Sequence, residues 1–222
     1  MLRVLGIGLA VLALGACANF RSGQSIAQRT AVAVPAEAGQ AAANWNVVNV
    51  RVIVPAELEV SEAGGYYPVG DIVWRGDPLG DRRAQVGQIL SDGLSAGLTH
   101  LTGPQAVDFQ IDVKRFHSVS ERTRATVGGV HDITFNLTVV DRATRQAIFG
   151  PIRMTPDLNA LGGGAASEAE ARGDTQKVRI LRHLGNVMRL EFPGNLPSSE
   201  LIQDGPAPVS VPAKTAIVVG DA

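Results

Sequence analysis

The sequence predicts an α+β domain, in which an antiparallel sheet of about four to five strands carries two helices on one face. Two observations lead to this expectation. Several segments alternate apolar and polar residues, which is the period of a half-buried strand, and two longer segments repeat apolar residues with the period of a helix. The expected order is β-(β)-β-α-β-β-β-α, where the strand in parentheses, at residues 57–61, is optional. Helices gathered on one side of an antiparallel sheet define the α+β class.

Strands are expected where the alternation is clearest. The first covers residues 45–55 and places four valines on one face: Val48, Val50, Val52 and Val54. A short strand follows at residues 71–75. Three further segments are expected to form an antiparallel meander with one packed face and one wet face: residues 107–116, 133–139 and 146–154. The polar residues 118–129 are expected to project from this meander, and the glycine- and alanine-rich residues 156–173 are expected to form a loop.

Two helices are expected, at residues 82–101 and 174–192. Asp81 stands where it can cap the first helix, because an aspartate side chain accepts hydrogen bonds from the free N–H groups of a first turn. Gly93 and Gly97 lie near the middle of the apolar face of this helix, although each glycine costs about 1 kcal/mol relative to alanine. The favoured explanation is close approach of the backbone to the sheet, and a small-residue contact with a partner helix is the alternative.

The first seventeen residues are organised like a bacterial export leader. Arg3 precedes an apolar stretch too short to span a membrane, which ends in Leu14-Gly15-Ala16-Cys17. These four residues resemble the lipobox of bacterial lipoproteins, which implies cleavage before Cys17 and lipidation of its thiol. Cys17 is the only cysteine in the sequence, and lipidation accounts for an unpaired cysteine in an exported chain. An uncleaved apolar segment or an ordinary export signal is the alternative.

The predicted signal peptide covers residues 1–16, and the chain after it is expected to divide into three parts. Residues 17–44 are expected to form the lipidated N-terminus and a flexible tether with a root-mean-square reach of about 30 Å. Residues 45–192 are expected to form a single α+β periplasmic domain, and the proline- and alanine-rich residues 193–222 a largely disordered tail. No aspartate follows Cys17 directly, which favours the outer membrane over the inner membrane. The chain is therefore expected on the periplasmic side of a membrane, held there by its acyl chains.

Composition and motifs argue against several classes of function. A formal net charge of −1 gives no general attraction to nucleic acid. A single cysteine permits neither a disulfide framework nor a cysteine-based zinc site. The sequence contains no nucleophile elbow, zinc-protease helix, phosphate loop or dinucleotide fingerprint. We therefore expect no enzymatic activity, no cofactor and no metal ion.

Two groups of residues are candidate binding surfaces. Amphipathic aromatic side chains favour interfaces, and the candidate partner surface holds every tryptophan and tyrosine of the chain: Trp45, Tyr66, Tyr67 and Trp74. Core packing of the two tryptophans is the alternative. The second group is a basic stripe on one face of the second helix: Arg179, Arg182 and Arg189. This stripe could meet phosphates of lipid head groups, and an ordinary solvated helix face is the favoured alternative.

A hydrolase acting on envelope material is an alternative from a different functional class. His117 and His131 are expected to face each other across the hairpin, with Asp132 beside one of them. Such a group could bind a metal ion or act as a general base with its orienting partner. Surface histidines on strands are common and no third ligand is apparent, so we disfavour the hydrolase.

The segment VVDRATRQAI, residues 139–148, resembles a strand–turn–strand pattern of small α+β periplasmic lipoproteins of Gram-negative bacteria. Residues 71–83, with the glycine-bearing helix after them, are similar to an alphaproteobacterial lipoprotein family of unknown function. The order of elements is more distantly similar to that of the auxiliary lipoproteins of ABC-type lipid transporters. The resemblance covers residues 45–192.

This resemblance implies a non-enzymatic binding or scaffolding component that works with an envelope protein partner. In the transporter case, it would be auxiliary to the transport of lipids or solutes. A lipid-binding module that uses a cleft between a helix and the sheet is the alternative function. The partners expected from the sequence are therefore the membrane itself, an envelope protein and, in the alternative, a lipid.

Overall fold

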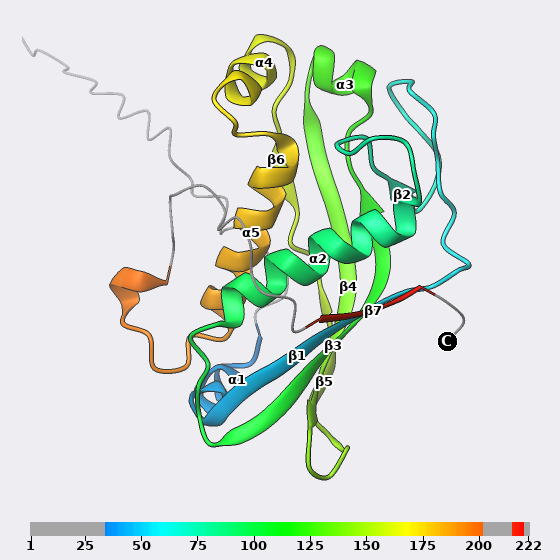
Figure 1. The fold of residues 1–222 in the computed structure, drawn as a ribbon. Coiled ribbons are helices and arrows are strands. Elements are labelled where there is room, and N and C mark those ends of the chain that lie inside the picture. Colours follow the sequence, from blue (N-terminus) through cyan, green and yellow to red (C-terminus); the bar gives the residue numbers. More distant parts are fainter. Residues whose placement is uncertain (1–33, 202–214, 220–222) are drawn as a thin grey trace, which may run out of the picture.

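The computed structural model describes residues 34–201 and 215–219 of the chain (Figure 1). The helices, in chain order, are α1 (Ala36–Ala41), η2 (Ala42–Asn44), α2 (Arg82–Leu98), α3 (Glu121–Ala125), α4 (Gly163–Ala171), α5 (Gln176–Glu191) and η3 (Ser198–Glu200). The strands are β1 (Trp45–Val54), β2 (Ile72–Val73), β3 (Gln105–His117), β4 (Gly129–Asp141), β5 (Ala147–Met154), β6 (Leu158–Ala160) and β7 (Thr215–Val219).

A mixed sheet forms the framework of the molecule. Its strands follow the order β5-β4-β3-β1-β7, with β2 paired to β3 and β6 paired to β4. The meander is confirmed, because β4 is antiparallel to both β3 and β5. β1 runs parallel to β3 and to β7. The α+β class is therefore confirmed, whereas the expectation of a wholly antiparallel sheet is wrong.

The direction of β1 follows from the helix that comes after it. β1 and β3 are neighbours in the sheet, and the chain between them forms α2. A helical crossover carries the chain back to the end of the sheet where the first strand began, so the second strand runs parallel to the first. Alternation within a strand gives its buried face but carries no information about its direction.

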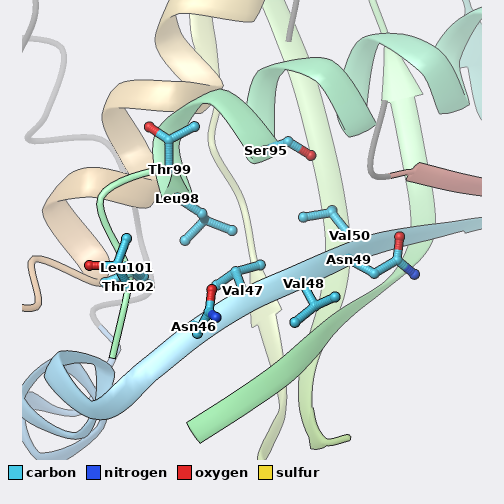
Figure 2. Close-up of a pocket in the computed structure, with 10 residues that line it drawn as sticks. All are labelled: Asn46, Val47, Val48, Asn49, Val50, Ser95, Leu98, Thr99, Leu101 and Thr102. Atoms are coloured by element: carbon cyan, nitrogen blue, oxygen red, sulfur yellow. The ribbon is translucent and has the colours of Figure 1, made fainter. Parts of the chain in front are cut away.

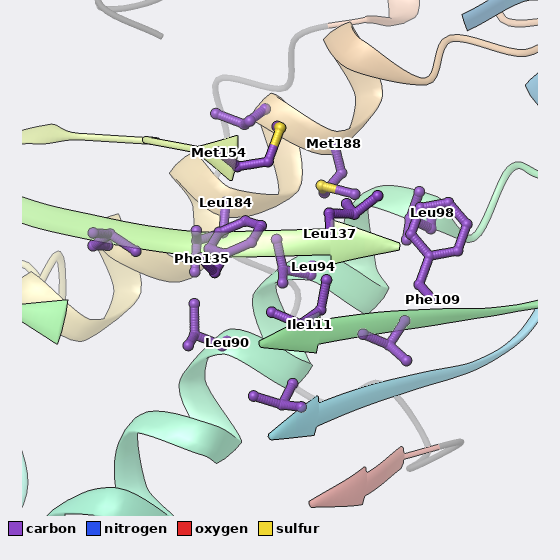
Figure 3. Packing of buried hydrophobic residues seen from close by; sticks show 14 of the residues in the cluster. Leu90, Leu94, Leu98, Phe109, Ile111, Phe135, Leu137, Met154, Leu184 and Met188 are labelled. Atoms are coloured by element: carbon purple, nitrogen blue, oxygen red, sulfur yellow. The ribbon is translucent and has the colours of Figure 1, made fainter. Parts of the chain in front are cut away.

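The core lies between the sheet and two helices, α2 and α5, which cover the same face of the sheet (Figure 1). Figure 3 shows side chains from both helices meeting those of β3, β4 and β5, including Leu94, Leu184, Phe135 and Met154. Residues of β3 alternate between buried and partly exposed positions along most of the strand. This pattern agrees with the prediction of one packed face and one wet face.

The glycines of α2 serve a contact between helices within the domain. A Cβ atom at Gly97 would lie 2.3 Å from the carbonyl oxygen of Gly185, and one at Gly93 would lie 2.9 Å from Cβ of Leu184. Both neighbours belong to α5. The expectation of close approach to the sheet is therefore wrong, because α5 packs against the glycine face of α2. Small residues let two helix backbones approach closely.

The folded region begins before the boundary predicted at residue 45. α1 and η2 lie within residues 17–44, which were expected to form a flexible tether. Val34, Ala38 and Ala42 are buried, and the backbone N–H of Val34 donates a 2.7 Å hydrogen bond to the carboxylate of Glu191 at the end of α5. This hydrogen bond and the burial of the three side chains hold residues 34–44 on the domain.

Several segments expected to lack regular structure also contain helices or strands. α3 lies within residues 118–129, and Ser120 caps it by accepting the backbone N–H of Thr123. Residues 156–173 contain β6 and α4, whose buried Ala166 and Ala169 account for the helix. β7, within the expected disordered tail, adds a parallel strand to β1. Short elements of this kind depend on tertiary contacts that local periodicity does not reveal.

Candidate functional site

The four residues of the predicted partner surface do not form one surface. Trp45 and Trp74 expose 3% and 0% of their surface, so the two tryptophans belong to the core. Trp45 lies 6.0 Å from the ring of Phe109, and the indole N–H of Trp74 donates a 2.8 Å hydrogen bond to a carboxylate oxygen of Asp77. Tyr66 and Tyr67 are exposed instead, by 43% and 94%. The candidate surface is therefore reduced to the two tyrosines.

The two tyrosines lie on a loop that is fastened to the hairpin between β3 and β4. We call residues 64–70 the tyrosine loop. Its carbonyl oxygens accept three hydrogen bonds from side chains of the hairpin: Gly65 from Ser120 at 2.5 Å, Tyr66 from Thr123 at 3.2 Å and Pro68 from His117 at 2.9 Å. The guanidinium of Arg122 lies 5.4 Å from the centre of the Tyr66 ring, within cation–π range. These contacts hold the backbone of the loop in place and the ring of Tyr66 against Arg122.

Ion pairs fix the chain on either side of the tyrosine loop. The buried guanidinium of Arg82, at the start of α2, lies 2.7 Å from a carboxylate oxygen of Glu62. Arg75 pairs with the same glutamate and, at 2.8 Å, with Glu121 of α3. These pairs join the loop region to α2 and α3. The tyrosine loop is thus braced at its base as well as along its length.

A cleft of about 300 Å³ lies between the C-terminal half of α2 and the first half of β1 (Figure 2). We call it the α2–β1 cleft. Its lining is Asn46, Val47, Val48, Asn49, Val50, Ser95, Leu98, Thr99, Leu101 and Thr102. The lining contains apolar, amide and hydroxyl side chains and no charged one. Its volume is at the lower end of the range for ligand sites.

The part of β1 that borders this cleft departs from the predicted alternation. Val48 was expected on the same face as Val50, but the pairing of β1 with β3 shifts register between Val47 and Asn49. Val48 is therefore the extra residue of a β-bulge, which re-aims the neighbouring side chains. Residues 46–50, on both sides of this shift, line the cleft.

The residues of the predicted hydrolase site do not converge. His117 is the register partner of Asp132, but its ring donates to a carbonyl of the tyrosine loop, and Asp132 pairs with Arg115 at 2.7 Å. His131 is fully buried, and its Nδ1 lies 2.8 Å from the hydroxyl of Ser118. Successive strand residues point to opposite faces. His131 and Asp132 therefore face different sides of the sheet.

His131 is a buried neutral base. Burial is the main cause that lowers its pKa to about 3, and the positive charges of Arg179 and His183 lower the pKa further. Its Nε2 has no hydrogen-bond partner among the described residues. A cavity of about 10 Å³ adjoins the ring, which is enough for roughly one water molecule. This surrounding suits a structural histidine and leaves no room for a substrate.

The arginines of the predicted basic stripe are engaged with their neighbours. Each makes at least one contact that holds its guanidinium on the domain: Arg179 donates to the carbonyl of Asn159 at 3.0 Å, Arg182 pairs with Asp174 at 2.5 Å and Arg189 donates to the carbonyl of Ala96 at 3.3 Å. Burial lowers the pKa of Arg179 and of Arg189. The arrangement favours the ordinary helix face over a phosphate-binding stripe.

Cys17 and the predicted signal peptide lie outside the described residues, so the structure does not test the predicted lipidation. In the described part of the chain, no helix has both the length and the apolar character needed to cross a membrane. The same residues contain no group of three or more histidine, cysteine, aspartate or glutamate side chains placed to hold a metal ion.

No curated protein matches this sequence. Among solved structures, a crystal structure of a Xanthomonas campestris protein of the family DUF330 has a TM-score of 0.39 and 12% sequence identity. That match covers 68% of this chain and 85% of the other. A family model matches residues 45–200, which is most of the described domain. The chain therefore belongs to DUF6778, a family of unknown function.

Proposed function

We propose that this chain is a membrane-anchored, non-enzymatic binding component of the bacterial cell envelope. In this proposal the lipidated Cys17 holds it on the periplasmic side of a membrane, with the outer membrane favoured. The tyrosine loop then docks onto an envelope protein. The single observation that carries the proposal is the tyrosine loop, in which an almost fully exposed Tyr67 stands on a braced backbone.

A braced aromatic loop suits protein binding for an energetic reason. Binding orders flexible side chains and loops at a cost, and a loop already held in place avoids much of that cost. Tyrosine and arginine are enriched among the residues that dominate binding energy. Tyr66, Tyr67 and Arg122 combine both features, because the arginine stacks on Tyr66 and the rings of the two tyrosines lie 6.5 Å apart.

The position of the loop favours a protein over the bilayer as its target. α1 lies at one end of the molecule, and the chain leads from it through β1 towards the tyrosine loop and α3 at the other end (Figure 1). β1 alone spans about 33 Å. Cys17 precedes α1 in the chain, so an anchor there would attach on the side of the α1 end and leave the tyrosine loop at the end away from the attachment.

The lack of convergent chemistry supports a role without catalysis. His117, His131 and Asp132 each have a separate structural partner, as described above. A general base must reach the proton that it abstracts, directly or through one water molecule. The buried His131 and the outward-facing Asp132 do not meet this condition together.

Photocrosslinking in intact cells tests the proposal. A photoreactive phenylalanine replaces Tyr67 in one variant and Ile148 in a control, since Ile148 is an exposed apolar residue on β5, away from the loop. We expect one discrete protein adduct from position 67 that position 148 does not give. The added substitution Arg122→Glu should weaken that adduct. Identical adducts from both positions, or monomer alone from position 67, would contradict the proposal.

The α2–β1 cleft is the observation that favours the second candidate, a lipid-binding module. Its apolar floor lies between a helix and the sheet, where such a module would bind its ligand. The cleft and the tyrosine loop are separate sites, so a ligand in the cleft would not exclude a protein bound at the loop.

A further inference from the structure

The ion pairs that brace the tyrosine loop leave one positive charge unmatched. Glu62 pairs with Arg75 and Arg82, and Glu121 pairs with Arg75. Arg122 follows Glu121 in α3, is exposed, and has no carboxylate within ion-pair distance among residues 34–201. Three arginines thus meet two glutamates beside the loop, and the charge of Arg122 is available to a partner.

The N–H groups of Arg122 are available as well as its charge. Its guanidinium lies 5.4 Å from the centre of the Tyr66 ring, and no acceptor within residues 34–201 takes a hydrogen bond from it. A guanidinium has five N–H donors in a planar fork, so a contact with one ring leaves donors free. This fork matches the two oxygens of a carboxylate. Tyr66 therefore helps to present Arg122 to a carboxylate.

The tyrosine loop adds apolar surface to this charge. Tyr67 and Val69 expose 94% and 84% of their surface, and the ring of Tyr67 lies 6.5 Å from that of Tyr66. Tyr66 thus lies between Tyr67 and Arg122, close to both. An extended chain advances about 3.3 Å per residue, so a segment of about four residues can reach from the arginine to the ring of Tyr67.

We propose that the tyrosine loop and α3 together receive an acidic, partly apolar segment of the partner protein. A carboxylate of this segment pairs with Arg122, and an apolar side chain a few residues away packs on Tyr67. This inference rests on the proposed docking function and names the chemistry that the partner presents. Charge complementarity of this kind determines which partner is accepted and how fast it associates, more than how tightly it binds.

A phosphate of an anionic lipid would offer Arg122 the same charge, but the surroundings favour a protein carboxylate. Recognition of anionic membranes generally takes a cluster of roughly four to eight basic residues. The neighbours of Arg122 do not supply such a cluster, because Arg75, Arg82 and Arg124 already pair with glutamates. One arginine beside an exposed aromatic ring suits a single carboxylate flanked by apolar groups.

The test uses two capped pentapeptides that differ in one charge, GFSDG and its asparagine counterpart GFSNG. Each is titrated into the isotopically labelled chain from residue 18 onward, which keeps every described residue, and amide chemical shifts are followed by NMR. We expect shifts at the tyrosine loop and α3, and about threefold to fivefold tighter binding of the aspartate peptide at low salt. This preference should shrink in high salt, because ions screen an exposed pair.

Matched variants assign the preference to one arginine. Arg122→Gln keeps a polar side chain without the charge, and we expect it to bind both peptides equally. Tyr67→Ala should weaken both peptides and keep the preference, because it removes only the apolar contact. Arg172→Gln is the control, since Arg172 is an exposed arginine directly after α4 and outside the loop. It should behave as the wild type does, and circular dichroism confirms that each variant is folded.

Four results would overturn the proposal. They are equal binding of the two peptides by the wild type, a preference that persists in Arg122→Gln, and no shift with either peptide at tens of millimolar. The fourth is binding to vesicles of phosphatidylethanolamine and phosphatidylglycerol that Arg122→Gln abolishes, which would assign the arginine to an anionic membrane. A photocrosslinked adduct from position 67 beside any of the first three results would leave the docking function standing without an acidic partner segment.

Discussion

Tyr67 and Trp74 lie seven positions apart, yet one is almost fully exposed and the other is fully buried. Trp74 packs against Phe116 at 5.8 Å between ring centres, whereas the one ring contact of Tyr67 among residues 34–201 is with Tyr66. Burial of a large aromatic side chain is worth several kcal/mol, and exposure of one is worth almost nothing to stability. The exposed side chain of Tyr67 therefore adds little to stability and can contact a partner.

Alanine substitution at these two positions separates a structural role from a binding role. We expect Trp74→Ala to lower the free energy of unfolding by about 3–5 kcal/mol, because it empties a core site. We expect Tyr67→Ala to change it by less than about 0.5 kcal/mol. Urea unfolding followed by circular dichroism measures both values. A loss of several kcal/mol at Tyr67 would show that its side chain supports the fold.

His131 makes stability depend on pH. Its folded-state pKa of about 3 lies below the ordinary value of 6.5, so the neutral ring is favoured in the folded domain. The unfolded chain takes up a proton below pH 6.5, while the folded chain does not until about pH 3. The stabilising effect of the neutral ring is therefore present above pH 6.5 and is lost as the pH falls towards 3.

The contribution of His131 can be measured directly. Proton uptake by His131 in the unfolded chain should lower the free energy of unfolding by about 2 kcal/mol at pH 5 relative to pH 7.5. Burial also lowers the pKa of His183, which acts in the same direction. In His131→Gln, which retains a polar side chain for Ser118, we expect a smaller loss between pH 7.5 and pH 5. Parallel pH profiles of the two proteins in urea unfolding would disprove this assignment.

At the scale of elements, the crossing of α2 and α5 determines how closely the two helices approach. Gly97 faces Gly185 and Met188 of α5, and its missing Cβ leaves room for the Gly185 carbonyl. Gly164, in α4, has nothing within 4 Å of where a Cβ would lie. The two glycines thus differ in their surroundings although both are helical.

The same substitution at both glycines tests the crossing. We expect Gly97→Ala to lower the free energy of unfolding by about 1–3 kcal/mol through overpacking. Gly164→Ala should raise it by up to about 1 kcal/mol, because alanine is the better helix former. Thermal or urea unfolding of the two variants gives the comparison. Stabilisation by Gly97→Ala would mean that the helices lie farther apart than described.

The elements that could be predicted from the sequence are those with long local patterns. The meander follows from alternation, and α2 begins where Asp81 can accept the N–H of Ala84, at 3.0 Å in the structure. The parallel direction of β1 and the contact between α2 and α5 depend on segments far apart in the chain. The sequence does not predict α1 and α4, because both helices are short and alanine-rich and neither has a strong apolar face.

The candidate surfaces also combine features that local sequence predicts with features that depend on distant segments. Aromatic residues near the start of the domain pointed to Tyr66 and Tyr67, but burial of Trp45 and Trp74 depends on Phe109 and Phe116 in a later strand. The α2–β1 cleft joins two elements that are separated by a long loop. That α2 lies beside β1 follows from the crossover connection of β1 to β3, which local patterns do not predict.

At the scale of the whole molecule, the proposed function depends on the anchor and the tyrosine loop lying at opposite ends of the domain. The chain enters the fold at α1, beside the C-terminal end of α5, and the tyrosine loop stands at the far end with α3 (Figure 1). A lipid anchor before α1 would orient the molecule, so that the loop meets proteins rather than lipid. Without the anchor, the loop would have no defined direction relative to the membrane.

Metabolic labelling with radioactive palmitate tests membrane anchoring, the central claim, most directly. The wild-type chain and Cys17→Ser are expressed in a Gram-negative host, immunoprecipitated and compared by size and by label. The account predicts that the wild type carries the label and runs at the size of a cleaved chain. Cys17→Ser should be unlabelled and should accumulate as the longer precursor. An unlabelled wild type, or label that persists in Cys17→Ser, would contradict the account.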